Sequence, residues 1–344
     1  MKYKLFGKSG LRVSELCLGA MTFGDGESWL SGREESFRIL SAYAEAGGNY
    51  IDTANIYAHG QSEQIVGEFI SSDREQFVIA TKYTHAFPGT APVNGAGNHR
   101  KSMVSALDSS LKRLNTDYID IYWLHLWDFL TPVDEVMRAL NDAVAAGKIH
   151  YIGFSDVPAW IVVQANMVAE RHGWNPITGL QLEYSLVQRS IERELIPMAR
   201  AFDISVNAWS PLSSGVLSGK YTRGKEADFR RGSAGFDIHT LNDEKRLIAE
   251  AVDEIADEIG ISSAAVALSW VLCKGTIPIL GARTSEQLAD NLTCLDCKLT
   301  EKQIAKLDEI SAIDFGHPYD MLDNPGVIAV TYGGFREQID FPAG

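Results

Sequence analysis

The sequence predicts an α/β protein, a (β/α)8 barrel with an N-terminal β-hairpin and a C-terminal tail that supplies substrate loops. Apolar strand segments and amphipathic helical segments alternate eight times along the 344 residues. The strand segments are apolar throughout, which is typical of parallel strands buried on both faces. Each strand segment ends in a polar residue or a glycine. In a barrel these ends meet at one mouth, where active sites form.

Two short stretches, 4–6 and 11–13, flank a turn bounded by Gly7 and Gly10 and predict the hairpin. After them, the spacing of apolar residues switches repeatedly between the strand and helix periods. The predicted strands are 16–19, 49–52, 77–82, 118–125, 149–155, 179–185, 204–210 and 276–281. The predicted helices are 34–46, 61–70, 100–114, 132–146, 158–172, 192–202, 244–258 and 285–295.

Barrels of this kind run from about 200 to over 400 residues as one domain, so we expect a single domain over 1–344. Within it, residues 1–13 form the hairpin, 14–296 the barrel, and 297–344 a C-terminal helix and tail. The alternative is a doubly wound sheet. The alternative is weakened because no GxGxxG motif follows the first strand, where that fold binds dinucleotides.

Charge and composition exclude several classes of partner. The chain has 31 Lys and Arg against 45 Asp and Glu, a net charge of −14. Without a basic cluster to offset that charge, we expect no nucleic acid and no anionic membrane as partners. The start of the chain has no signal-peptide pattern, and no apolar run approaches about 18 residues. We therefore expect a soluble, cytoplasmic protein.

Four cysteines are too few for a disulfide framework in a chain of this length. Cys294 and Cys297 form a CxxC pair, but they lie late in a predicted helical stretch. A reactive thiolate is favoured at a helix start instead. No other residues have metal-ligand spacing, so we expect no metal site.

Ionisable residues stand at the ends of three consecutive predicted strands. The segment NYIDTANIY places Asp52 at a strand end and Tyr57 in the loop that follows. Lys82 ends the next strand and His125 the one after it. Alone, Asp52 could be a helix cap or a solvated loop residue. In a barrel, however, the four side chains converge on one mouth.

These four side chains fit proton donation to a carbonyl compound. A lysine cation about 4 Å from a phenol is worth roughly 4 kcal/mol at an effective dielectric near 20, about three pKa units. Burial of the phenol opposes this effect, so we expect a smaller net fall in the pKa of Tyr57. Asp52 would hold Lys82 in place. Tyr57 would then protonate a developing alkoxide, and His125 would orient the carbonyl oxygen.

The motifs at the strand ends resemble those of the aldo-keto reductase family across nearly the whole chain. They are LCLGAMTFG, IDTANIY, ATK, WLH, GFSD, GLQLEYS, WSPL and GARTSEQLADNL, in that order. The resemblance implies a catalytic tetrad at Asp52, Tyr57, Lys82 and His125. It also implies an NAD(P)H cofactor that lies extended over the barrel mouth without a Rossmann motif.

The resemblance further implies which residues contact that cofactor. Near the nicotinamide these are Gly19, Ala20, Met21, Asp52, Ser155, Asp156, Gln181 and Trp209, of which Ser155 and Gln181 hold the carboxamide and Trp209 stacks on the ring. Over the pyrophosphate they are Ser210, Pro211, Leu212, Gly215, Lys220 and Arg230. Around the adenosine end they are Gly281, Arg283, Gln287, Asp290 and Asn291.

Arg283 bears on the choice of cofactor, because a guanidinium can pair bidentately with a 2′-phosphate. We therefore expect NADPH (NADP+) to be preferred over NADH. The alternative for Arg283 is a solvated residue at a helix start. Lys220 and either Arg230 or Arg231 likewise clamp phosphate or are exposed.

One position departs from the family pattern. The residue after Ser155 is commonly Asn in the family, and here it is Asp156. The stretch that begins at Ser155, SDVPAW, is similar to the aryl-alcohol-dehydrogenase-like branch. The stretch WSPLSSGVLSGKY is also similar to the potassium-channel β-subunit branch. The branch and the substrate therefore stay open.

Aromatic residues in the loops after the strands are candidates for substrate contact. We predict Trp29, Tyr57, His125 and Trp127 as substrate-binding residues, with the tail from 315 to 332 nearby. An aromatic, uncharged lining suits aryl or long-chain aldehydes and ketones better than phosphorylated sugars. The tail could instead pack on a neighbouring subunit, which leaves a homo-oligomer open.

The predicted function is therefore NADPH-dependent reduction of aldehydes or ketones to alcohols, with Tyr57 as proton donor. The alternative is a nucleotide-binding, redox-sensing regulatory subunit of a protein complex. The presence of His125 favours the enzyme, because subunits of the second kind can depart from the family at that position. Measurable turnover would distinguish the two.

Overall fold

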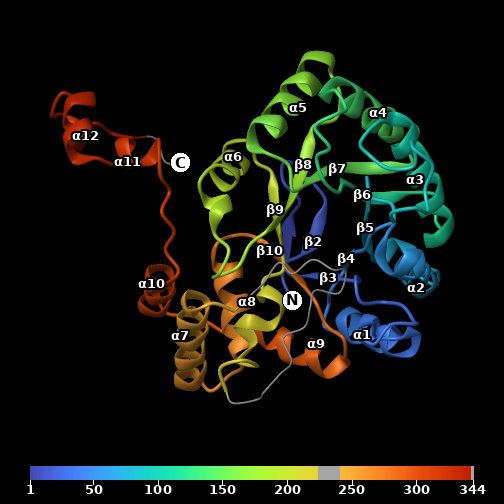
Figure 1. Cartoon of the computed structure of the whole chain (residues 1–344), viewed down its shortest axis with the longest axis horizontal. Helices are drawn as coiled ribbons and strands as arrows, with labels where there is room; N and C mark the ends of the chain where they lie inside the picture. The colour runs from blue at the N-terminus through green and yellow to red at the C-terminus, as the bar shows by residue number, and fades with distance from the viewer. Residues whose placement is uncertain (224–240, 342–344) are drawn as a thin grey trace. The chain divides into compact units, whose positions relative to one another are not determined.

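The computed structural model describes residues 1–223 and 241–341 and contains a closed barrel of parallel strands (Figure 1). The chain divides into two compact units, Met1–Ser311 and Ala312–Gly344. The first unit holds the hairpin, the barrel and the helices around it. The predicted (β/α)8 fold is confirmed.

Eight strands close the barrel in the order β10-β3-β4-β5-β6-β7-β8-β9. Their bounds are β3 Cys17–Gly19, β4 Tyr50–Asp52, β5 Val78–Tyr83, β6 Ile119–Leu124, β7 Ile149–Ser155, β8 Ile177–Glu183, β9 Ser205–Trp209 and β10 Ile277–Leu280. All eight pairings between neighbours are parallel. The carboxyl ends of all eight strands therefore lie at the same end of the barrel.

Helices surround the barrel (Figure 1). The α-helices of the first unit are α1 Arg33–Glu45, α2 Gln61–Ile70, α3 Arg100–Leu114, α4 Val133–Ala145, α5 Ala159–His172, α6 Leu195–Ala201, α7 Asp243–Ile259, α8 Ser263–Cys273, α9 Ser285–Leu292 and α10 Glu301–Ile310. Short 3-10 turns are η1 Tyr57–Gly60, η2 Arg74–Gln76, η3 Ser190–Glu192, η4 Ser213–Ser218 and η5 Thr293–Leu295. Most of the predicted helices match within one or two residues.

Helix α8 was not predicted, since the predicted strand 276–281 followed the predicted helix 244–258 without another helix between them. Every residue from Ser263 to Val271 is buried. A helix that is covered on all sides has no polar face, so its sequence lacks the amphipathic pattern by which surface helices are found. The predicted helix 192–202 is also shorter in the structure, because η3 takes its first turn.

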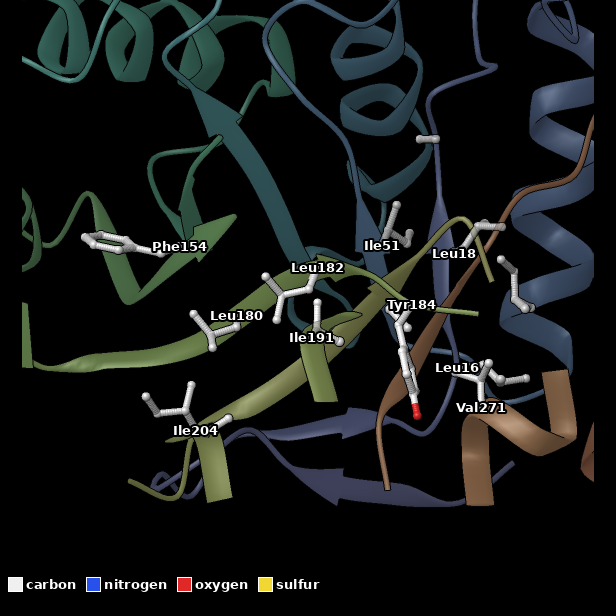
Figure 2. Packing of buried hydrophobic residues seen from close by; sticks show 14 of the residues in the cluster. Leu16, Leu18, Ile51, Phe154, Leu180, Leu182, Tyr184, Ile191, Ile204 and Val271 are labelled. Atoms are coloured by element: carbon white, nitrogen blue, oxygen red, sulfur yellow. The ribbon is translucent and has the colours of Figure 1, made fainter. Parts of the chain in front are cut away.

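Two apolar clusters hold the barrel together. The larger one lies between the strands and the helices, and Figure 2 shows members of it from both, among them Ile51, Phe154, Leu180 and Val271. The smaller one comprises Phe6, Val13, Cys17, Tyr50, Val78, Ala80, Ile121, Trp123, Ile277 and Ile279. Alternate residues of a strand point to opposite faces, so strands β4 to β6 contribute to both clusters.

The N-terminal hairpin contributes to the smaller cluster. Strand β1 Tyr3–Leu5 pairs antiparallel with β2 Arg12–Ser14, as predicted. Phe6, just after β1, packs edge to face against Tyr50 and Trp123 of the barrel strands, at ring centroid distances of 6.2 and 6.1 Å. The hairpin therefore covers the interior of the barrel with an aromatic side chain.

Two glycines leave room for the rings inside the barrel. A Cβ atom on Gly153 would lie 2.2 Å from the indole of Trp123. One on Gly179 would lie 2.3 Å from the ring of Phe6. Both distances are far below van der Waals contact, so the aromatic packing requires glycine at these two positions.

The second unit contains α11 Tyr319–Leu322, α12 Pro325–Thr331 and η6 Arg336–Gln338. Asn324 caps α12 through its side chain, which accepts hydrogen bonds from the amides of Gly326 and Val327. Among the helices of residues 1–223 and 241–341, no single one has both the length and the apolar character to cross a membrane. The bent pair α7 and α8 passes by length and composition alone.

Candidate active site

The period of the strands places three of the predicted catalytic residues inside the barrel. Tyr50 and Ala80 belong to the interior cluster, and so does Trp123. Asp52, Lys82 and His125 each follow one of these residues by two positions. They therefore lie on the same interior side, one step nearer the mouth. The local sequence thus fixes three side chains from three strands at one end of the barrel.

Lys82 connects two of the other predicted catalytic residues. Its side chain is fully buried, as is nearly all of the Asp52 carboxylate, with which it forms a salt bridge and a hydrogen bond. Its ammonium also donates to the carbonyl of Thr53 at 2.9 Å and to the hydroxyl of Tyr57 at 3.1 Å. Three acceptors thus satisfy the three donors of the ammonium. Burial opposes the charged form of Lys82, but the adjacent Asp52 carboxylate outweighs it and raises the pKa of Lys82, which stays charged.

The loop after β4 brings Tyr57 back over the strand end. Amides of Thr53 and Asn55 donate to the carbonyls of Ala80 and Lys82, which ties the loop to β5. After Tyr57, the backbone of Ala58 and His59 has φ of 44° and 57°, in the left-handed region. These residues bend the chain sharply between β4 and α2, which leaves the Tyr57 ring partly exposed at the mouth.

His125 completes the group and is neutral at pH 7. Its ring packs edge to face on Tyr57 at a centroid distance of 6.0 Å. Burial, the charge of Lys82 and neighbouring His85 hold the pKa of His125 well below the ordinary value for histidine. A neutral imidazole carries one N–H, which can donate to a carbonyl oxygen. The rings of His85 and His125 lie 4.3 Å apart.

The prediction that the pKa of Tyr57 falls is wrong for this structure. Burial raises the pKa of Tyr57, and the charge of Lys82 opposes that rise without cancelling it. The cost of burying a phenolate exceeds the attraction to an ammonium whose charge is already paired with Asp52. Tyr57 is therefore protonated at neutral pH.

The ends of β7, β8 and β9 bring together the residues predicted around the nicotinamide. Ser155 ends β7, and its neighbour Asp156 accepts a hydrogen bond of 3.1 Å from the indole N–H of Trp209. The amide of Asp156 donates to the carbonyl of Gln181 at 3.2 Å. The side-chain amide of Gln181 donates to Asp52 at 2.9 Å. Hydrogen bonds therefore link these predicted contacts to the predicted catalytic group.

Residues predicted over the pyrophosphate form a strongly curved loop after β9. Ser210, Ser213, Ser214 and Gly215 all have positive φ, between 48° and 91°. Such a backbone makes a concavity of amide groups that suits a phosphate. Pro211 and Leu212 lie within this loop, and Lys220 places its ammonium 5.1 Å from the ring centroid of Tyr221. The predicted contact Arg230 lies outside the described residues.

Residues predicted around the adenosine lie just before and along α9. The amide of Arg283 donates to the side chain of Gln287 at 2.9 Å. The side chain of Asn291 donates to the carbonyl of Gly281 at 3.2 Å, which fastens the helix to the end of β10. Thr284 caps the helix, and Asp290 is exposed on it. Arg283 thus stands beside a helix N-terminus, where anions are favoured.

At the end of β3, the three predicted residues differ in exposure. Gly19 closes the strand, Ala20 is fully buried, and Met21 is 44% exposed. The Ala20 amide donates to the carbonyl of Asp52 at 2.8 Å. Among the predicted nicotinamide contacts on this strand, only the side chain of Met21 reaches the surface.

A model of the Aldo/keto reductase family matches residues 15–312, which include all eight barrel strands. The chain belongs to the aldo/keto reductase family. It is 37% identical over 329 residues to a norsolorinic acid reductase of Aspergillus flavus, covering 92% of this chain and 83% of the relative. It is 35% identical over 333 residues to the aryl-alcohol dehydrogenase [NADP(+)] of Phanerodontia chrysosporium, covering 90% and 86%.

A third relative, an aldo-keto reductase of Aspergillus calidoustus, is 35% identical over 335 residues, 93% of this chain and 85% of the relative. As an aldo/keto reductase, this chain is an NAD(P)H-dependent oxidoreductase that interconverts carbonyl compounds and alcohols.

The residues at the mouth of the barrel fit the dinucleotide. The loop 210–215 has the backbone curvature that suits a phosphate, and among the described residues the buried side-chain oxygen of Asn207, two positions before Trp209, has no partner.

The predicted substrate residues of this reductase differ in position. Tyr57 and His125 stand at the mouth, as described above. Trp29 is partly buried in the loop after β3 and donates to Glu27 at 2.5 Å. Trp127 is only 6% exposed, and its ring packs 6.4 Å from that of Phe154 in the outer core. The structure therefore places Trp127 in the packing behind the mouth.

Two residues at the mouth were not predicted. Asn55 donates to the carbonyl of His85 at 3.0 Å and joins the loops after β4 and β5. Its place inside IDTANIY, between two predicted site residues, was the available signal. Glu183 ends β8 close enough to Asp156 for the two carboxylates to repel. Nothing in a single sequence pairs residues 27 positions apart on adjacent strands, so this contact required the fold.

Proposed function

We propose that this aldo/keto reductase reduces aldehydes or ketones with NADPH, and that Tyr57 donates the proton. The proposal rests on two hydrogen bonds that the buried Lys82 ammonium donates, one to the Asp52 carboxylate and one to the Tyr57 hydroxyl. An ammonium that faces a phenol stabilises the phenolate formed when the proton leaves.

Each of the four side chains has one task in this proposal. The phenol of Tyr57 passes its proton to the carbonyl oxygen as the carbon is reduced. Lys82 remains charged and stabilises the phenolate, while Asp52 keeps Lys82 in place. The neutral imidazole of His125 donates a hydrogen bond to the same oxygen and orients it. When bound, NAD(P)H supplies the hydride that becomes the new C–H bond. A proton from water restores the phenol afterwards.

The raised pKa of Tyr57 is consistent with this role. A phenol that stays protonated at neutral pH is a ready acid for an alkoxide, which is a far stronger base. The lowered pKa of His125 is also consistent with the proposal. Burial and the charge of Lys82 keep the imidazole neutral, so it does not repel Lys82 and its one N–H can donate to the carbonyl oxygen. The site is therefore arranged with one cation, one neutral donor and one neutral acid.

NADPH is proposed over NADH on two grounds. Arg283 stands at the start of α9, where a guanidinium and a helix N-terminus act together on a 2′-phosphate. The relative from Phanerodontia chrysosporium carries NADP(+) in its name.

For the substrate, the same relative is named for aryl alcohols, and the His59 and Phe87 rings stack 4.0 Å apart in loops at the mouth. We propose aryl aldehydes and ketones.

The test is the loss of NADPH absorbance with a panel of aryl, aliphatic and sugar aldehydes, run beside NADH. We expect turnover with NADPH, and aryl aldehydes as the best substrates. Tight binding of NADPH without turnover of any aldehyde would contradict the reductase and favour the redox-sensing subunit. Equal kcat/KM with NADH would contradict the cofactor preference alone.

A further inference from the structure

Asp156 places a carboxylate beside the residues proposed to hold the nicotinamide. Its neighbour Ser155 and its backbone partner Gln181 are the proposed carboxamide contacts, and its own side chain bonds to the indole of Trp209. The backbone of Asp156 is left-handed, with φ of 49°. This conformation is strained for most residues other than glycine, and Asp and Asn tolerate it best. The fold therefore holds the carboxylate in a fixed position.

The charges around Asp156 come from several elements. Lys82 on β5 attracts the carboxylate, and Glu183 at the end of β8 repels it. Tyr57 in η1 lies within electrostatic range of it, and the indole of Trp209 on β9 donates to it. Because Lys82 is already paired with Asp52, its charge does not neutralise Asp156 as well. The net local charge at the ends of β7 and β8 is negative at neutral pH.

We propose that Asp156 makes the site discriminate between the redox states of its cofactor, because its carboxylate favours the positively charged ring of NADP+ over the neutral ring of NADPH. The proposal rests on the proposed function and on the predicted contacts of Ser155, Gln181 and Trp209 with that ring. An Asn at the same position would offer the same shape without the charge, so it would not discriminate on this basis.

The consequence concerns the direction of the reaction. A site that stabilises the oxidised form makes hydride donation from the bound reduced form more favourable, by thermodynamic linkage. Carbonyl reduction on the enzyme is then favoured, and release of NADP+ becomes slower. Two electrons and one proton leave the ring as hydride, so the ring gains one unit of positive charge, which the carboxylate of Asp156 balances.

The experiment compares the Kd values of NADP+ and NADPH for the wild-type protein and Asp156→Asn, measured by calorimetry at pH 7.5. At an effective dielectric near 20, a charge a few ångströms away changes binding by about tenfold or more. We expect the ratio of the NADP+ Kd to the NADPH Kd to rise by about tenfold in Asp156→Asn. Glu170→Gln removes one exposed acid from α5 and should leave the ratio unchanged.

An unchanged ratio in Asp156→Asn, with both cofactors still bound, would overturn the proposal and leave the proposed function intact. A wild-type protein that binds neither cofactor would overturn the proposed function instead. Asn suits a left-handed backbone, so the variant should fold. If it does not, Asp156→Gly must give the same rise in the ratio, because Gly also accepts positive φ and carries no charge.

Discussion

The Nζ atom of Lys82 lies 3.1 Å from the hydroxyl oxygen of Tyr57 and donates a hydrogen bond to it. The same ammonium neutralises the buried carboxylate of Asp52. In the proposed mechanism, one cation therefore serves both the stability of the barrel and the chemistry at its mouth. Substitutions at the three residues can separate the two roles.

Lys82→Met should destabilise the protein by about 3–5 kcal/mol, because it leaves the Asp52 carboxylate buried without a counter-ion. The double variant Lys82→Met with Asp52→Asn should recover most of that loss, since no buried charge remains. Neither variant should reduce carbonyl compounds at a measurable rate. Urea denaturation gives the free energies of unfolding. A double variant as unstable as the single one would show that the lost stability does not come from the stranded charge.

Tyr57→Phe should lower kcat by about 10³-fold or more, because general acid catalysis contributes about 10²–10⁴-fold and no other phenol is bonded to Lys82 in the described residues. The Kd of NADPH should change by less than about threefold. Stopped-flow measurement of NADPH oxidation checks the rate. Tyr118→Phe, which removes only a bond to Glu75 on the outside of the barrel, is the matched control. Equal rates in both variants would remove Tyr57 as the acid.

Asp156→Asn should gain stability relative to the wild type as the pH rises. Burial raises the pKa of Asp156 to about 6, above the ordinary 3.8, so the native state binds more protons than the unfolded state between those values. The stability that Asp156 contributes to the wild type is therefore fully present below about pH 4 and is lost as the pH rises through about 6. The gain of the variant between pH 4 and 7.5 should be about 2 kcal/mol.

Urea denaturation at both pH values measures that difference. Asp128→Asn is an informative comparison, because hydrogen bonds from the amides of Asn98, Leu130 and Thr131 lower the pKa of Asp128 despite its burial. That variant should lose stability relative to the wild type as the pH rises toward about 4, which is the opposite sign in a lower pH window, so its measurement is extended to about pH 3. A gain for Asp156→Asn that does not change with pH would contradict the prediction.

Arg283→Ala should weaken NADPH binding by about tenfold or more and NADH binding by less than about threefold, because only NADPH carries the 2′-phosphate that a guanidinium can grip at two points. Calorimetric Kd values for both cofactors measure this. Gln287→Ala, which removes a partner of the Arg283 amide but no charge, should change the two affinities alike. Equal weakening of NADPH and NADH in Arg283→Ala would assign the arginine another role.

Gly153→Ala should lower the free energy of unfolding by about 1–3 kcal/mol, the usual cost of overpacking. The new methyl group would meet the indole of Trp123, which fills the barrel interior and cannot move aside. Gly10→Ala is the control, because a Cβ atom there meets nothing within 4 Å. Thermal unfolding of both variants tests the packing of the interior. Equal melting temperatures would mean that the ring of Trp123 adjusts freely.

The sequence by itself determined the barrel and the group at its mouth. Runs of buried strand residues that end at Asp52, Lys82 and His125 predicted both the strands and the shared interior face. The period of two along a strand is a local property, and parallel pairing brings every strand end to the same side. The resemblance of the strand-end motifs then pointed to the family, which the comparisons confirm.

The tertiary structure decided what depends on several elements at once. Helix α8 could not be predicted, because it is buried on all sides and its sequence therefore shows no polar face. The pKa of Tyr57 rises where a fall was expected, because burial comes from the whole mouth and the nearby lysine is paired with Asp52. The repulsion between Asp156 and Glu183 arises only when β7 and β8 lie side by side. Charge interactions and burial depend on distances through space, which a linear sequence does not contain.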